Sequence, residues 1–145
     1  MTPADMAALH RACFTVPRPW SAAEIADLQA LPQVFVCTES AGFAMGRVAA
    51  DEVELLTLAV DPAQRRQGAG RRLVAAFLAE AARRAAVRAF LEVLPDNNAA
   101  VSLYLQANFT VCGRRKAYYH PAGSPALDAL VMDRVLLGQI GLPVS

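Results

Sequence analysis

The order of patterns between Val53 and Leu94 constrains the fold most strongly. Val53 to Val60 is a run typical of a strand, Gly70 to Val87 has the apolar spacing of a helix, and Ala89 to Leu94 is a short, mostly apolar strand. A strand, a helix and a second strand in this order make the two strands parallel, with the helix as a right-handed crossover. The sequence therefore predicts an α/β (α+β) domain with a parallel strand pair.

Two short helices are expected before this unit. The first begins at Thr2 and Pro3, a capping residue and a proline suited to the first turn, and apolar residues follow at helical spacing as far as Cys13. The second follows a capping box, Ser21 to Glu24, and stops at Pro32. Its expected apolar face consists of Ile25, Leu28 and Leu31.

The remaining runs predict a mixed, mostly antiparallel sheet. Val34 to Thr38 and Phe43 to Ala49 precede the strand at Val53 to Val60 and form an antiparallel meander with it. After Leu94 we expect one helix, from the turn at Asn97 to about Ala107, and two closing strands, Phe109 to Cys112 and Leu130 to Leu136. The chain is expected to be a monomer or a weak dimer, and an exposed final strand near Leu130 could pair between two subunits.

Length and charge limit the class of protein. A chain of 145 residues with 55% hydrophobic content is expected to form one domain, residues 1–145. Fourteen basic and 13 acidic residues leave a net charge of +1, so neither nucleic acid nor a membrane surface is an expected partner. Three scattered cysteines and two histidines give no metal-site spacing, and no signal or spanning segment is recognised. We expect a cytoplasmic protein without a metal.

Two glycines and four arginines stand between the first parallel strand and its helix, in the stretch Gln64 to Leu73. Within a helix, Gly68 and Gly70 would each cost about 1 kcal/mol relative to alanine. As a loop, the stretch offers no Ser, Thr, Asp or Asn to cap the free N–H groups of the helix start. An anion fits there, because the N–H groups, the helix dipole and the arginines all favour negative charge. A plain surface turn is the alternative reading.

These residues resemble a known family. Arg65-x-x-Gly68-x-Gly70, after Leu58-Ala-Val-Asp-Pro62, is similar to the acetyl-CoA pyrophosphate loop of the GNAT acyltransferase superfamily. The resemblance covers nearly the whole chain and is closest to the ribosomal-protein N-terminal alanine acetyltransferases of the RimI type. Its other matching pieces are Pro19-Trp-Ser21, Leu91-Glu-Val93, Asn97, Leu103-Tyr104, Phe109, Arg114-Arg115 and Tyr118-Tyr119.

The resemblance implies a GNAT fold with six to seven strands and about four helices, and acetyl-CoA as co-substrate. Backbone groups of Leu58, Ala59 and Val60 would pair with the pantetheine arm, as an added strand pairs with a sheet edge. Asn97 would bond the same arm, although a plain role as helix cap is equally open. The pyrophosphate would lie on the loop residues Arg65, Arg66, Gln67, Gly68, Ala69, Gly70 and Arg71.

Acetyl transfer to an amine needs a base, because the α-amine (pKa about 8) and the lysine amine (about 10.4) are largely protonated at neutral pH. Glu92 is the one acid in the run Ala89 to Leu94 and matches the family's catalytic glutamate, while Glu54 is the reserve candidate. Tyr104 matches the family's general acid and would act as a hydrogen-bond donor to the leaving sulfur. Solvent exposure of Glu92 and a core role for Tyr104 are the alternatives.

The function expected from the resemblance is acetyl transfer from acetyl-CoA to a primary amine, with a protein or peptide N-terminus as the first acceptor and a ribosomal protein among the candidates. Alternatives are a small-molecule amine or lysine as acceptor, or a CoA-binding module without catalysis. Leu94 stands where the family's arginine follows Leu-Glu-Val, which puts ribosomal-protein specificity in question. Asn108 stands in place of the family's glycine and suits the same left-handed helix end.

Overall fold

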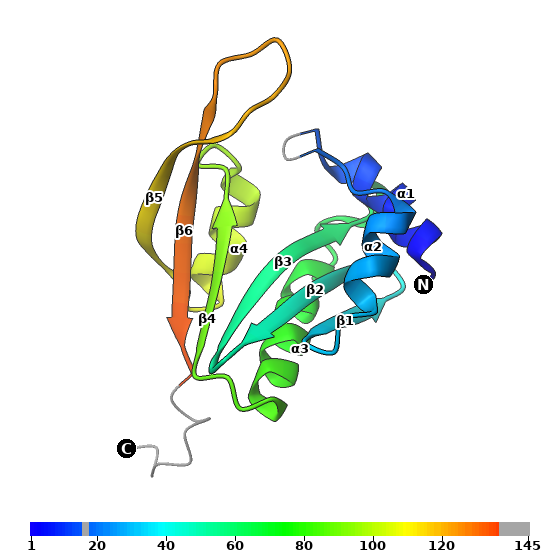
Figure 1. The fold of residues 1–145 in the computed structure, drawn as a ribbon, viewed down its shortest axis with the longest axis vertical. Coiled ribbons are helices and arrows are strands. Elements are labelled where there is room, and N and C mark those ends of the chain that lie inside the picture. The colour runs from blue at the N-terminus through cyan, green and yellow to red at the C-terminus, as the bar shows by residue number, and fades with distance from the viewer. Residues whose placement is uncertain (16–17, 137–145) are drawn as a thin grey trace.

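The computed structural model describes residues 1–15 and 18–136 as a mixed α/β fold (Figure 1). Its sheet has the order β1-β2-β3-β4-β6-β5. The helices and strands of the described chain are α1 (Pro3–Cys13), α2 (Ala22–Gln29), β1 (Val34–Glu39), β2 (Gly42–Ala49), β3 (Glu52–Val60), the 3-10 turn η1 (Pro62–Gln64), α3 (Ala69–Arg83), β4 (Arg88–Val93), α4 (Asn98–Gln106), β5 (Thr110–Tyr119) and β6 (Leu127–Val135).

The predicted parallel pair and meander are confirmed. β3 and β4 are parallel, with α3 as the crossover between them, and the other neighbouring strands are antiparallel. The parallel pairing covers only Glu52 to Glu54, opposite Arg88 to Phe90. Beyond these residues the two strands diverge, so the sheet opens into a V between β3 and β4 (Figure 1).

A β-bulge accompanies this divergence. Met45 of β2 pairs with Thr57, but the next residue, Gly46, pairs with Leu55, which leaves Leu56 as the extra residue of β3. A bulge bends its strand and interrupts the alternation of side chains between the two faces. Leu56 and Thr57 therefore point to the same face of the sheet, toward α1 and α2.

The core has one part on each face of the sheet. On one face α3 and α4 cover a cluster that includes Phe77, Leu91 and Phe109. On the other face α1 and α2 cover a smaller cluster that includes Met6 and Ile25. Adjacent residues of β2 belong to opposite clusters, as the period of two along a strand requires.

Both N-terminal helices begin as predicted, and two ends differ from the prediction. Thr2 and Ser21 each form a capping box. The second helix ends at Gln29, so Leu31 lies beyond it and is exposed rather than part of its apolar face. α3 ends at Arg83 instead of Val87, because Ala85 adopts a left-handed φ of 62°, which is incompatible with an α-helix. The side chain of Ala85 is exposed.

The closing strands were also predicted too short. β5 continues past Cys112 to Tyr119, through Arg114, Arg115 and Lys116, which lack the apolar alternation expected of a strand. β5 is an edge strand with almost no buried residue, so nothing requires that alternation. The strand that contains Leu130 lies between β4 and β5, so it is not the exposed edge that was expected.

The three cysteines are all free thiols. Within residues 1–15 and 18–136, no helix combines the length and the apolar character that crossing a bilayer requires. The same residues contain no cluster of three His, Cys, Asp or Glu side chains arranged to hold a metal ion.

Two polar side chains, His10 and Thr57, are buried beneath α1 and α2. His10 is 1% exposed and stacks on Trp20, with ring centroids 5.0 Å apart. Its Nδ1 accepts the backbone N–H of Trp20 at 3.1 Å, and its Nε2 lies 3.1 Å from Thr57 Oγ1. Burial lowers the pKa of His10 from 6.5 to about 4. His10 therefore stays neutral and ties α1 to β3.

This neutral histidine predicts a specific loss of stability in acid. Between pH 6.5 and pH 4 the unfolded chain binds a proton at His10 that the folded chain does not, so the free energy of unfolding falls as the pH falls through this window. The loss is on the order of 3 kcal/mol. Urea unfolding of wild type and His10→Gln from pH 7.5 to 4.5 measures it. We expect the stability difference between the two proteins to shrink with acid; a constant difference would contradict the prediction.

Candidate active site

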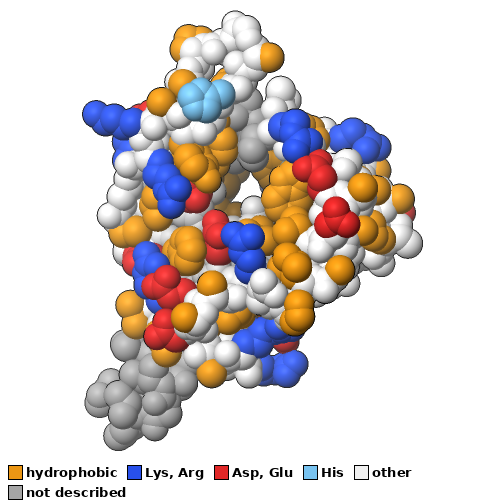
Figure 2. All heavy atoms as spheres, viewed as in Figure 1, with side chains coloured by type: hydrophobic (Ala, Val, Ile, Leu, Met, Phe, Trp, Pro, Cys, Tyr) orange, Lys and Arg blue, Asp and Glu red, His pale blue; other side chains and the backbone are white. Residues whose placement is uncertain are grey.

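The divergence of β3 and β4 creates a cleft with a volume of about 890 Å³. Its walls come from both strands, the N-terminal end of α3, one side of α4, and Cys13 and Phe14 at the end of α1. The space-filling view shows a hollow between two lobes, with hydrophobic side chains on both rims and charged side chains beside them (Figure 2). The cleft therefore reaches the surface and combines apolar walls with nearby charge.

The start of α3 lies in this cleft without a side-chain cap. Gly68 is the N-cap, with a left-handed φ of 82°, and among the described residues no side chain accepts a hydrogen bond from the first N–H groups of the helix. A side chain at Gly68 would be strained by this φ, and its Cβ would lie 3.0 Å from Arg72 Nη1. At Gly70 a Cβ would lie 3.2 Å from Leu103 of α4, so glycine lets the two helices approach closely.

Positive charge surrounds these bare amides. Arg65 and Arg66 line the cleft, and no carboxylate of the described residues pairs with either of them. Arg71 also lines the cleft and donates to Gln106 Oε1 at 3.1 Å. Unlike these three, Arg72 forms a bidentate pair with Glu39, with distances of 2.9 and 2.8 Å. The arrangement suits a phosphate group, since amides, helix dipole and guanidinium groups converge on one place.

The cleft gathers most of the residues that the sequence singled out, and two lie elsewhere. The side chain of Ala59 is buried on the α1 and α2 face. Gln67 is exposed, and its carbonyl accepts a hydrogen bond from Arg72 at 2.8 Å. The predicted residues that line the cleft are Leu58, Val60, Arg65, Arg66, Gly68, Ala69, Gly70, Arg71, Glu92, Asn97 and Tyr104.

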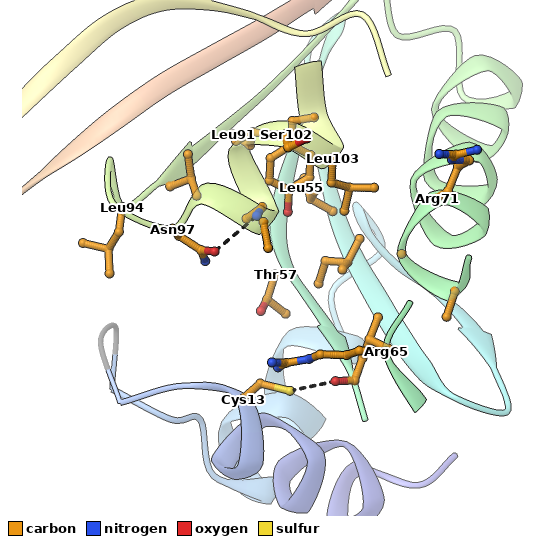
Figure 3. Close-up of a pocket in the computed structure, with 18 of the residues that line it drawn as sticks. Cys13, Leu55, Thr57, Arg65, Arg71, Leu91, Leu94, Asn97, Ser102 and Leu103 are labelled. Atoms are coloured by element: carbon orange, nitrogen blue, oxygen red, sulfur yellow. Dashed lines mark hydrogen bonds between the residues drawn. The ribbon is translucent and has the colours of Figure 1, made fainter. Parts of the chain in front are cut away.

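Past the bulge, one edge of β3 pairs with no other strand in the part of the chain that the structure describes. Pairing with β4 ends at Glu54, while Asp61 still donates its N–H to Ala41 on the β2 side at 2.7 Å. Because backbone groups alternate sides along a strand, those of Leu58 and Val60 point toward the cleft. The Val60 carbonyl already accepts the Cys13 thiol at 3.2 Å (Figure 3). This edge could pair with an extended, amide-bearing ligand.

Glu92 projects from β4 on the face opposite the α3 cluster, and its side chain is 11% exposed. Its Oε2 lies 3.2 Å from Arg115 Nε, without hydrogen-bond geometry and without another partner among the described residues. Burial raises the pKa of Glu92 above the ordinary 4.5, although the charge of Arg115 opposes this. The reserve candidate, Glu54, forms an ion pair with Arg47 at 3.1 Å. Both carboxylates thus face an arginine, but of the two only Glu92 lines the cleft.

Tyr104 comes from α4 and lines the cleft from the α3 side of the sheet. Its ring packs edge-on against Phe109, with centroids 6.0 Å apart. Burial raises the pKa of Tyr104 well above 10, so its hydroxyl holds its proton firmly. The ring therefore belongs to the core, and the residue also borders the cleft.

Asn97 likewise has two roles open to it. Its Oδ1 accepts the N–H of Ala100 at 3.2 Å and so caps α4. The residue also lines the cleft, near Leu94 at the junction of β4 and α4 (Figure 3). Capping uses the amide oxygen and leaves the amide NH₂ as a donor for a ligand.

Sequence reasoning assigned no role to several residues that border the cleft or Glu92. Cys13 and Phe14 reach the cleft from α1, and Arg115 approaches Glu92 from β5, so only the fold brings them together. Thr57 had a local signal, because it is the only polar residue in the apolar run Leu55 to Val60. That signal does not tell which face the residue occupies, because the bulge is not visible in the sequence.

Comparisons with known proteins show what the chain as a whole is similar to. Residues 4–109 match the model of the acetyltransferase (GNAT) family. The chain is 36% identical over 118 residues to the [ribosomal protein bS18]-alanine N-acetyltransferase of Escherichia coli K12, which covers 79% of each chain. The crystal structure of the ribosomal-protein-S18-alanine N-acetyltransferase from Escherichia coli superposes with a TM-score of 0.77 and 30% identity, covering 92% of this chain and 86% of that one. Ard1 from Thermoplasma volcanium gives a TM-score of 0.77 at 28% identity, covering 93% of each.

Proposed function

Because the chain belongs to the GNAT family of acetyltransferases, and is thus an acetyl-CoA-dependent N-acetyltransferase, we propose that it acetylates the α-amine of a peptide or protein N-terminus, with Glu92 as base and Tyr104 as acid. The observation that carries this proposal is the buried Glu92 carboxylate, whose Oε2 has no hydrogen-bond partner among the described residues, at the wall of a cleft that also contains the bare start of α3. The bacterial relative named above acts on an alanine of ribosomal protein bS18.

The residues of the cleft fit acetyl-CoA. The uncapped amides from Gly68 to Arg71 and the arginines beside them would hold the pyrophosphate. The free edge at Leu58 and Val60 and the amide of Asn97 would hold the pantetheine arm. The co-substrate supplies an acetyl thioester, whose carbonyl carbon is the electrophile.

Glu92 takes the proton that the amine must lose. The amine nitrogen forms a bond to the acetyl carbon, the carbon–sulfur bond breaks, and the proton passes from nitrogen to the Glu92 carboxylate, directly or through a water. A pKa raised by burial makes Glu92 a stronger base than an exposed glutamate.

Tyr104 stabilises the leaving sulfur as a hydrogen-bond donor. A free thiol has a pKa of about 8.5, far below that of a buried tyrosine, so complete proton transfer from Tyr104 to the thiolate would be uphill. A hydrogen bond to the developing negative charge avoids that cost and still lowers the barrier.

Competition between acceptors tests the proposed substrate class. At pH 7.5 roughly a quarter of a peptide α-amine is neutral, against about 0.1% of a lysine amine. We expect alanine- and serine-initiated peptides to be acetylated at the α-amine at least about 100-fold faster than an N-terminally blocked peptide with an internal lysine. Mass spectrometry of a peptide panel, with small amines in parallel, locates the acetyl group. Faster acetylation of the blocked peptide or of a small amine would overturn the peptide assignment.

A further inference from the structure

Thr57 places a hydroxyl in the cleft on the same face of the sheet as Glu92. The bulge at Leu56 turns Thr57 toward α1, and the alternation of β4 directs Glu92 to that face as well. The last pair of the parallel register is Glu54 with Phe90. Two residues further along each strand, Leu56 comes level with Glu92, and Thr57 is the next residue of β3. Thr57 and Glu92 therefore border the V from opposite strands, while Tyr104 and the start of α3 lie toward the other face.

The geometry around His10 fixes which atom carries a proton. The backbone N–H of Trp20 can only donate, so His10 Nδ1 must be the acceptor of that hydrogen bond. A neutral imidazole with Nδ1 unprotonated carries its proton on Nε2. Nε2 is therefore the donor in the 3.1 Å contact with Thr57 Oγ1.

This direction leaves the hydroxyl proton of Thr57 available. Thr57 Oγ1 uses one lone pair to accept from His10, and no acceptor for its own proton is found among the described residues. The residue lines the cleft, and its side chain points into the cavity (Figure 3). With the opposite tautomer of His10 the proton would point away from the cleft. The buried histidine thus makes Thr57 a hydrogen-bond donor toward whatever occupies the cleft.

We propose that Thr57 Oγ1 donates to the first carbonyl oxygen of a peptide acceptor, and that His10 positions that hydroxyl. This inference rests on the proposed peptide acceptor and adds a reason why a peptide is preferred to a simple amine. In a peptide the first carbonyl is one carbon removed from the amine, so a base on β4 and a donor one residue beyond its level on β3 can hold both groups. The acetyl carbonyl is the competing target, and the experiment separates the two.

The test compares Thr57→Val with wild type on two acceptors. One is an alanine-initiated peptide; the other is isopropylamine, which keeps the amine and the methyl group but has a methyl in place of the carbonyl. We expect Thr57→Val to raise KM for the peptide about five- to tenfold, the effect of one hydrogen bond, with a much smaller change in kcat. The variant-to-wild-type ratio of kcat/KM for isopropylamine should stay within about twofold. Because each variant is compared with wild type on the same acceptor, the difference in basicity between the two amines cancels from these ratios.

Three further variants make the result interpretable. Thr57→Ser keeps the hydroxyl and should restore the low peptide KM. Thr38→Val makes the same substitution at an exposed position of β1 and should change neither acceptor's kinetics. If Thr57→Val proves too unstable because His10 Nε2 loses its acceptor, Thr57→Ala leaves room for a water to take that role.

Each outcome decides one claim. A loss confined to the peptide supports the inference. An equal loss on both acceptors assigns Thr57 to the acetyl carbonyl, and no loss on either makes its hydroxyl inert; both results overturn the inference and leave the proposed function intact. A wild-type enzyme that acetylates isopropylamine but no peptide overturns the proposed function and the inference together.

Discussion

Gly68→Val abolishes measurable binding of acetyl-CoA. Gly68 has a φ of 82°, which a β-branched residue rarely adopts, and any Cβ there meets Arg72 at 3.0 Å. The loop must therefore rearrange, and with it the amides at the start of α3 and the placement of Arg65 and Arg66. Loss of several charge-assisted hydrogen bonds weakens binding by at least about 100-fold. Equilibrium dialysis with radiolabelled acetyl-CoA measures the change.

Gly123→Val is the matched control. Gly123 also has a left-handed φ, of 72°, but a Cβ there meets no atom within 4 Å, and the residue does not line the cleft. The substitution Gly123→Val therefore introduces a similar backbone strain at a position away from the cleft. We expect Gly123→Val to bind acetyl-CoA as wild type does. If both variants lose binding equally, strain rather than the phosphate loop explains the loss; if neither does, the loop is not the binding site.

Glu92→Gln lowers kcat/KM for the peptide acceptor by about 10²- to 10⁴-fold at pH 7, while the affinity for acetyl-CoA stays unchanged. The amide cannot take the proton from the attacking amine. The deficit should narrow as the pH rises above about 8, because the amine then reaches the active site already neutral. In the wild type, the rate should fall in acid as Glu92 is protonated, at a pH above 4.5 because burial raises its pKa. Stopped-time assays from pH 5.5 to 9.5 trace both curves.

Glu54→Gln is the control for this assignment. Glu54 is a strand carboxylate that also forms an ion pair with an arginine, but it does not line the cleft. We expect the Glu54 variant to keep a pH profile parallel to that of wild type. A Glu92 variant with unchanged rates across the pH range would show that the assigned base is wrong, and a loss confined to Glu54→Gln would transfer the role to the reserve candidate.

The fold was predictable where local chemistry decides it. The parallel pair follows from the order of strand, helix and strand, and the first two helices follow from the caps Thr2 and Ser21. Features set by tertiary contacts were not predictable. The end of α3 depends on a left-handed Ala85, which no propensity indicates, and the length of β5 depends on pairing with β6 rather than on its own pattern.

In the candidate site, too, the features set by local sequence were predictable and those set by tertiary contacts were not. The loop around Gly68 was visible because glycines without a capping residue before a helix are unusual. The surroundings of Glu92 and Thr57 were not, since Arg115 and His10 come from distant segments. A lone histidine in a sequence gives no sign of the hydroxyl that it will orient 47 residues away.

We propose that the bare amides at the start of α3 hold the diphosphate of the coenzyme. Calorimetric titration of the wild-type protein with acetyl-CoA and with acetyl-pantetheine, which carries the same acetyl thioester but no phosphate, tests it most directly. One acetyl-CoA should bind per chain, and acetyl-pantetheine should bind at least about 100-fold more weakly. Equal affinities for the two compounds, or no heat with acetyl-CoA, would contradict it.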